Sequence, residues 1–296
     1  MLPSLAPSGS YHRGEDGAES LGAHVEGPFI SPGRNGIHKP EVLRAANTWD
    51  DIVYCYGQDN LASSIKMITA APEVGRMTTH IPCFVERGIV YSTGHSDATY
   101  EQGLEATQQG ASMVTHLFNA MQPFEHRNPG IFGLLGQSET HRRPFYGVIA
   151  DGIHLHPTSI KIAYHAYPDG LVLVTDAMRL CGLPDGVYDW MNGDRIVKSG
   201  PRLTLEGSNK IAGSSATLIE CVNNFRRWSN ASVADALRAV TSTPARMLGL
   251  QGVKGSLEAG ADADLVVLGE SGDADGPILT VDQVWKFGVK IYDGDK

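Results

Sequence analysis

Three side chains that suit a divalent cation follow short apolar runs: Glu26 in "LGAHVEGPF" (21–29), His95 in "IVYSTGHS" (89–96) and His116 in "ASMVTHLF" (111–118). Imidazole and carboxylate donors bind zinc, and they also bind iron, cobalt or manganese. Three protein ligands plus one open position are typical of a catalytic metal site. Taken singly, each residue has an ordinary alternative as a hydrogen-bonded core or loop side chain, so the prediction depends on all three meeting.

A fourth acidic residue, Asp176, ends the apolar run "LVLVTDAM" (171–178). A carboxylate beside a metal-bound water can take its proton and later return it to a leaving group. The alternative is that Asp176 caps the segment that follows it.

Two histidines and one arginine are candidates for substrate contact. His38 lies in "GIHKP" and His154 lies in "ADGIHLHP". Arg127 lies in "HRNPG", a loop expected on the same face as His116, where a guanidinium can clamp a phosphate or carboxylate. Its alternative is a solvated surface arginine.

The elements that would position these residues show a regular alternation. Apolar runs cover 21–29, 65–73, 89–96, 111–118, 145–154 and 171–178, with helical candidates at 99–110 and 158–168. Such alternation predicts parallel βαβ units, and their number favours a (β/α) barrel over an open doubly wound sheet. Barrel enzymes place their active sites at the carboxyl ends of the strands. The predicted strand ends carry Glu26, His95, His116, Asp151, His154 and Asp176.

The second half of the chain departs from this alternation. Asp-Gly and Asn-Gly pairs between short alternating runs predict a β-hairpin insertion over about 179–215. Two helices are predicted at 218–229 and 232–250, and strands of a small β-subdomain at 261–269 and 281–294. We therefore expect a barrel domain over 1–255 and a C-terminal β-subdomain over 256–296.

Composition narrows the class of partner. The 296 residues carry a net charge of −9, which argues against binding to nucleic acid or to anionic membranes. No apolar stretch approaches the length of a membrane span. The four cysteines form no C-x-x-C pair, and the N-terminus does not resemble a signal peptide, so we expect a reduced, cytoplasmic protein.

Longer motifs carry a family resemblance. "GAHVEGPFISPGRNGIHKP", "TGHSDATYEQGLEATQQGASMVTHLFNAM", "RNPG", "IADGIHLHP" and "GSLEAGADADLVVL" together resemble the N-acetylglucosamine-6-phosphate deacetylases of the amidohydrolase superfamily. The resemblance implies a (β/α)8, TIM-like, metal-dependent hydrolase barrel and a homodimer. It also implies hydrolysis of N-acetylglucosamine 6-phosphate to glucosamine 6-phosphate and acetate.

The resemblance also implies roles for individual residues. Glu26, His95 and His116 would hold one divalent metal ion, with zinc first among the candidates. Asp176 would activate water and protonate the leaving amine, and His38 would help to polarise the acetamide carbonyl. Contacts to the sugar phosphate would come from Asn119, Ala120, His154 and, across a dimer interface, Arg127.

The start of the chain differs from the family pattern. Family members carry roughly a hundred more residues there, which supply the first barrel strand. "MLPSLAPS" (1–8) is expected to be a remnant of the second strand, which makes the barrel incomplete at the first. Two alternatives stay open: an unstable or non-catalytic homologue that at most binds sugar phosphate, and an amidohydrolase acting on another N-acyl or cyclic amide.

Overall fold

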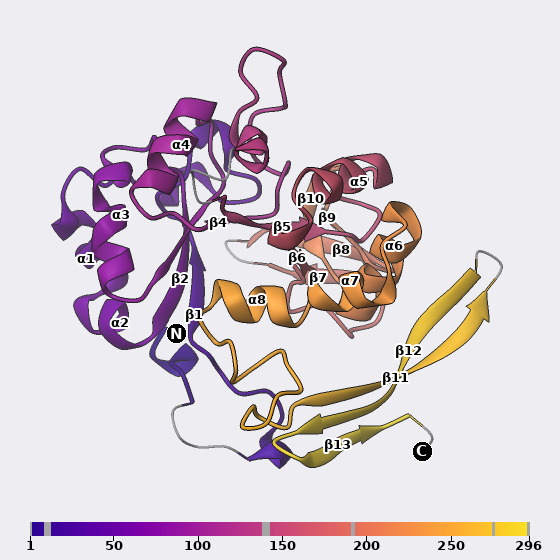
Figure 1. The fold of residues 1–296 in the computed structure, drawn as a ribbon. Helices are drawn as coiled ribbons and strands as arrows, with labels where there is room; N and C mark the ends of the chain where they lie inside the picture. Colours follow the sequence, from indigo (N-terminus) through magenta and orange to yellow (C-terminus); the bar gives the residue numbers. More distant parts are fainter. Residues whose placement is uncertain (1, 9–12, 138–142, 191–192, 274–275, 295–296) are drawn as a thin grey trace.

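The computed structural model describes residues 2–8, 13–137, 143–190, 193–273 and 276–294, and three β-sheets organise them (Figure 1). The parallel sheet consists of β1 (Ala23–Glu26), β2 (Ile65–Ala70), β3 (Val90–Thr93), β4 (Met113–Val114), β5 (Phe145–Ile149) and β6 (Leu171–Val174). The helices are α1 (Trp49–Tyr56), α2 (Gln58–Ser63), α3 (Met77–Glu86), α4 (Tyr100–Gln108), α5 (Pro157–Ala166), α6 (Leu218–Ser229), α7 (Val233–Arg238) and α8 (Ser242–Met247).

The parallel sheet confirms all six apolar runs as strands. They lie in chain order from β1 to β6, and every neighbouring pair is parallel. Over the described residues the sheet is curled and open, with β1 and β6 as its edges. The helices α1–α4 flank its first strands, and α5–α7 gather beside its last ones (Figure 1).

The prediction of a strand within residues 1–8 is wrong. Leu2–Leu5 forms a 3-10 helix instead, and residue 1 lies outside the described residues. Pro3 and Pro7 explain the difference, because proline has no N–H to donate to a strand ladder. The described sheet thus has six strands, two fewer than a closed eight-stranded barrel, whereas the family resemblance implied that one strand would be absent.

The predicted helices 99–110 and 158–168 are confirmed as α4 and α5. Thr99 begins α4 with a capping box, because its side chain accepts from Gln102 N while the Gln102 side chain accepts from Thr99 N. His156 caps α5 by accepting from Thr158 N, and Pro157 takes the first helical position.

The single helix predicted over 232–250 is broken into α7 and α8, whereas 218–229 is confirmed as α6. Pro244 causes the break, because it lacks the N–H that would bond the Val240 carbonyl and its ring crowds that carbonyl. The Ala239 carbonyl, next to the break, accepts instead from Leu173 N of β6 at 3.0 Å.

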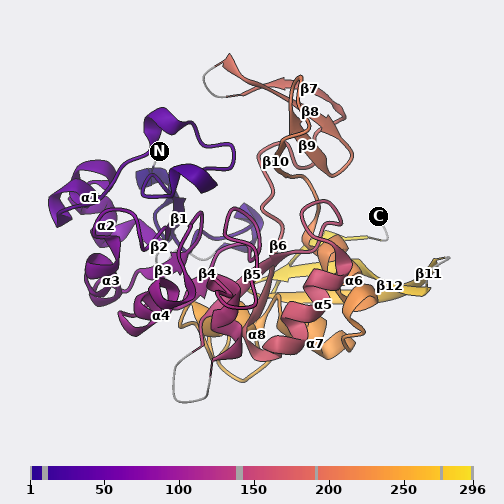
Figure 2. The same cartoon turned by 90° about the horizontal axis from the view of Figure 1, so that it is seen from above.

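The insertion over 179–215 is larger than the predicted hairpin. It forms an antiparallel sheet of β7 (Gly186–Asp189), β8 (Arg195–Ser199), β9 (Arg202–Leu205) and β10 (Ile211–Ser214), and its residues 191–192 lie outside the described residues. Figure 2 shows this sheet projecting from the rest of the chain. Its last strand is tied to the end of β6, since Ser214 N donates to Asp176 O at 3.1 Å and Met178 N to Ser214 O at 2.9 Å.

The C-terminal sheet consists of β11 (Leu265–Asp273), β12 (Gly276–Lys286) and β13 (Val289–Asp293), all antiparallel. The strand predicted over 281–294 is therefore a hairpin. Its turn is Phe287–Gly288, with φ values of 50° and 78°, the backbone that a tight two-residue turn needs. Within the described part of the chain, none of the helices has the length and apolar character needed to cross a membrane.

Candidate metal centre

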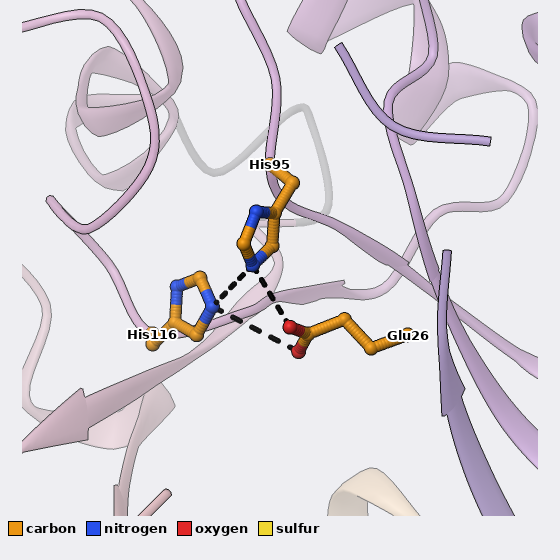
Figure 3. Close-up of side chains that lie close together, drawn as sticks. All are labelled: Glu26, His95 and His116. Carbon is orange, nitrogen blue, oxygen red and sulfur yellow. Dashed lines mark hydrogen bonds and ion pairs between the residues drawn. The ribbon is translucent and has the colours of Figure 1, made fainter. Parts of the chain in front are cut away.

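The three predicted ligands converge at one edge of the parallel sheet. Glu26 is the last residue of β1, and His95 and His116 each follow the end of their strand by two residues. His95 Nε2 lies 2.8 Å from Glu26 Oε1 and 3.1 Å from His116 Nε2, and His116 Nε2 lies 3.8 Å from Glu26 Oε2 (Figure 3). Parallel strands produce this convergence because their carboxyl ends share an edge.

This triad fits one divalent cation. One ligand atom from each residue lies within 4.8 Å of the others. A tetrahedral ion with bonds of about 2.0–2.1 Å separates its ligand atoms by about 3.3 Å, which falls inside the observed range. Two imidazoles and one carboxylate are a donor set for zinc and for its first-row neighbours.

The backbone at the strand ends is strained in a way that marks a functional site. His95, His116 and Asp176 have φ values of 49°, 27° and 49°, and Phe118 and Ala120 also have positive φ. Non-glycine residues rarely adopt this conformation, and they keep it only where the surrounding structure enforces it. Here it turns the side chains of three strand ends toward one point.

The charge states of two triad members, Glu26 and His116, suit a cation. Burial acts to raise the pKa of Glu26, but hydrogen bonds from His38 and His95 lower it well below its usual range. Burial lowers the pKa of His116 to about 4. Glu26 is therefore ionised and His116 neutral at pH 7, and these are the forms that bind metal.

Asp176 and His38 lie beside the triad. Burial, together with the charge of Glu26, raises the pKa of Asp176 to about 6. His38 Nε2 lies 3.2 Å from Glu26 Oε1, and its ring packs edge-on against that of His95. Both predicted residues therefore lie beside the metal ligands.

A cavity of about 830 Å³ opens at the triad. It is lined by the predicted residues Glu26, His38, His95, His116, Asn119, Ala120, His154 and Asp176. Arg127 does not line it in the described part of this single chain; its side chain is exposed, and its backbone N–H donates to Glu125.

Several lining and supporting residues were not predicted. The insertion contributes Trp190, Asp194 and Lys210 to the cavity wall. Asp151 Oδ2 lies 2.7 Å from His154 Nδ1 and holds that ring in place, a role that the position of Asp151 at a strand end did not by itself predict. The motif "ADGIH" places Asp151 three residues before His154, and that spacing was the available signal.

A strand-end triad on a curled parallel sheet defines a metal-dependent hydrolase of the barrel type, and a comparison with known families agrees. The amidohydrolase family matches residues 83–290. Within it, the deacetylase of Danio rerio is 43% identical over 277 residues, which are 92% of this chain and 68% of that protein. The chain belongs to the N-acetylglucosamine-6-phosphate deacetylases.

Solved structures give the same result. The N-acetylglucosamine-6-phosphate deacetylase of Pasteurella multocida matches with a TM-score of 0.80 and 30% identity, over 94% of this chain and 69% of that one. A variant of the Mycobacterium smegmatis deacetylase, solved with N-acetyl-D-glucosamine-6-phosphate, matches with a TM-score of 0.77 and 33% identity. It aligns over 91% of this chain and 68% of that one. This chain spans about two thirds of the length of these relatives.

Proposed function

We propose that this chain hydrolyses the acetamide of N-acetylglucosamine 6-phosphate, releasing acetate and glucosamine 6-phosphate. The observation that carries the proposal is the triad of Glu26, His95 and His116 with Asp176 beside it in one cavity. The relatives that share this fold carry the same activity in their names, and one of them was solved with this sugar phosphate.

Glu26, His95 and His116 would hold the metal, and the cation would supply Lewis acidity toward the amide and its attacking water. Zinc is the metal that we propose, since the donor set suits it. His38 donates from its ring toward the carbonyl oxygen as negative charge develops there.

Asp176 is the proposed proton carrier. Its ionised carboxylate takes a proton from the attacking water, whose oxygen bonds to the acetyl carbon. The C–N bond then breaks, and the same proton passes to the amine nitrogen. A pKa of about 6 suits both steps near neutral pH, because the group is neither too weak a base nor too weak an acid.

The sugar phosphate would lie along the cavity wall formed by Asn119, Ala120 and His154. Asn119 is anchored beside His116, since its side-chain amide donates to the His116 and Leu117 carbonyls. We propose that Arg127 of a second copy supplies the cation for the phosphate, because this chain's own Arg127 lies in an exposed loop and does not line its cavity in the described residues. A homodimer in the cytoplasm, with the barrel over 1–255 and a subdomain over 256–296, completes the proposal.

The test is acetate release by the purified chain with and without added zinc, on N-acetylglucosamine with and without the 6-phosphate. We expect zinc-dependent release that is strongest on the phosphorylated sugar. Binding of the sugar phosphate without acetate release would support a non-catalytic binder instead. Equal rates on both sugars would favour another amidohydrolase activity. So would the absence of turnover on both sugars, if a cyclic imide or an N-acetyl amino acid assayed in parallel is hydrolysed.

A further inference from the structure

The loop over residues 31–38 packs directly against the metal ligand His95. His95 Nδ1 donates to the Arg34 carbonyl at 2.6 Å, and Ser31 N donates to the His95 carbonyl at 2.8 Å. The same loop ends in His38, which contacts Glu26. The position of this loop therefore affects two residues of the site at once.

One carboxylate holds the loop in place. Arg34 Nε donates to Asp97 Oδ1 at 2.6 Å, and Ser31 Oγ donates to Asp97 Oδ2 at 2.7 Å. Both oxygens of Asp97 are thus used on the loop. The ion pair joins residues that lie 63 positions apart in the sequence.

Hydrogen bonds with neighbouring side chains fix the backbone of Asp97. Its backbone N–H donates to Glu73 Oε1 at 2.6 Å, and its carbonyl accepts from Gln122 Nε2 at 2.7 Å. Ser96 Oγ donates to the other oxygen of Glu73 at 2.7 Å. Asp97 is therefore a rigid anchor on the strand-end segment that also carries His95.

Two glycines show how closely the loop fits. A Cβ on Gly33 would lie 2.7 Å from Asp97 Oδ2, closer than side-chain carbons approach. Gly36 has a φ of +55°, and a Cβ there would lie 3.1 Å from Cε1 of His95. A side chain at Gly33 would displace the Asp97 carboxylate, and one at Gly36 would press on the His95 ring from a strained backbone, so glycine suits both positions.

We propose that Arg34 and Asp97 form a positioning pair that fixes the ring of His95 for metal binding by holding the Arg34 carbonyl against Nδ1. The inference rests on the metal site of the proposed function. A carbonyl can only accept a hydrogen bond, so Nδ1 carries the proton and Nε2 is left to face Glu26 and His116. Partners that orient a ligand histidine in this way strengthen its binding to the metal.

The test is zinc affinity, measured by competition with a chromophoric chelator in the absence of substrate. Arg34→Met keeps the aliphatic stem and removes the charge, and Asp97→Asn removes the charge from the other side. We expect both variants to bind zinc about ten-fold or more weakly. The matched control is Arg238→Met, which breaks the half-exposed Arg238–Asp235 pair on α7 and should leave zinc affinity unchanged.

A second readout separates positioning from general stability. In the metal-free protein at alkaline pH, where the ring of His95 is neutral, nitrogen NMR of His95 should report the Nδ1–H tautomer in the parent chain and a mixture in Arg34→Met. Arg34→Lys, which retains the charge, should recover part of the zinc affinity.

Zinc affinity within about two-fold of the parent in both variants would overturn the proposal. So would an equal loss in Arg238→Met. If Arg34→Met does not fold, Asp97→Asn and Ser31→Ala decide the matter by the same measurement. The zinc measurements contain no substrate, so they are independent of acetate release. A chain that binds zinc but releases no acetate would contradict the proposed function and leave the positioning role of Arg34 and Asp97 unaffected.

Discussion

His154 donates from Nδ1 to Oδ2 of Asp151 across 2.7 Å, and the Asp151 side chain is completely buried beneath it. The second oxygen of Asp151 accepts from the backbone N–H groups of Ile153 and His154. Burial acts to raise the pKa of Asp151, but the hydrogen bonds from His154 lower it. The carboxylate therefore stays ionised and holds the ring with Nε2 toward the cavity.

Asp151→Asn is expected to weaken substrate binding more than it slows the chemistry. The amide can present an N–H to His154 Nδ1, which would favour the other tautomer and place a proton on Nε2. We expect KM for the sugar phosphate to rise about ten-fold with kcat changed far less, since His154 is proposed to bind rather than react. Steady-state kinetics measures both, and Asp169→Asn on the exposed surface is the control. An unchanged KM would show that His154 does not contribute to binding of the sugar phosphate.

Asp176→Asn is expected to abolish turnover while leaving the metal and the sugar phosphate bound. An amide can neither accept nor return the proton, and such a loss costs about 10²–10⁴-fold in rate. Acetate release measures the rate, and calorimetry with zinc and with substrate measures binding. Near-normal turnover in this variant would show that another group carries the proton.

The raised pKa of Asp176 also predicts a pH dependence of stability in the metal-free chain. Between the ordinary value of 3.8 and about 6, the folded chain binds a proton that the unfolded chain has lost. The contribution of Asp176 to stability is therefore present below pH 3.8 and is lost as pH rises through 6. At pH 8, Asp176→Asn should melt at a higher temperature than the parent, and at pH 4 the two should melt alike. The difference in unfolding free energy at pH 8 should be on the order of 1 kcal/mol, because solvent at the cavity wall limits the effect. A lower melting temperature for Asp176→Asn at pH 8 would contradict this account.

The ligand triad could be predicted from the sequence because each ligand is fixed by a local rule. Glu26, His95 and His116 end apolar runs, and parallel strands bring such ends together. Arg34 and Asp97 follow no such rule. Their contact depends on how a glycine-rich loop folds over a strand end that lies far away in the sequence. A local sequence pattern does not predict such a contact.

The same distinction explains the errors in the fold. A helix over 232–250 fits the apolar spacing, but Pro244 removes one hydrogen bond, and β6 uses the carbonyl beside the break. The hairpin turn at Phe287–Gly288 interrupts an apolar alternation that reads as one strand. In both cases the decisive signal is one residue within a run that otherwise follows the pattern.

Zinc is expected to stabilise the folded chain through the triad. A ligand at a hundred times its dissociation constant adds about 2.7 kcal/mol, which corresponds to a rise of roughly 5 °C or more in Tm for a chain of this size. Differential scanning fluorimetry of the metal-free protein with increasing zinc tests this. Glu26→Gln should lose most of the rise, whereas Glu105→Gln on the exposed side of α4 should keep it. An equal rise in both variants would place the zinc elsewhere.

The C-terminal sheet is expected to depend on one asparagine for its attachment to the parallel-sheet domain. Asn223 of α6 donates from Nδ2 to the Leu279 carbonyl at 2.9 Å and accepts from Leu279 N at 2.8 Å. Leu279 is buried in the main hydrophobic core, so Asn223→Ala leaves two buried backbone groups without partners. Each such group costs about 1–3 kcal/mol, and we expect Tm to fall by several degrees. Asn209→Ala, in an exposed turn of the insertion, is the control, and thermal melting of the metal-free chains makes the comparison. Equal melting temperatures for the two variants would mean that other contacts hold the C-terminal sheet on α6.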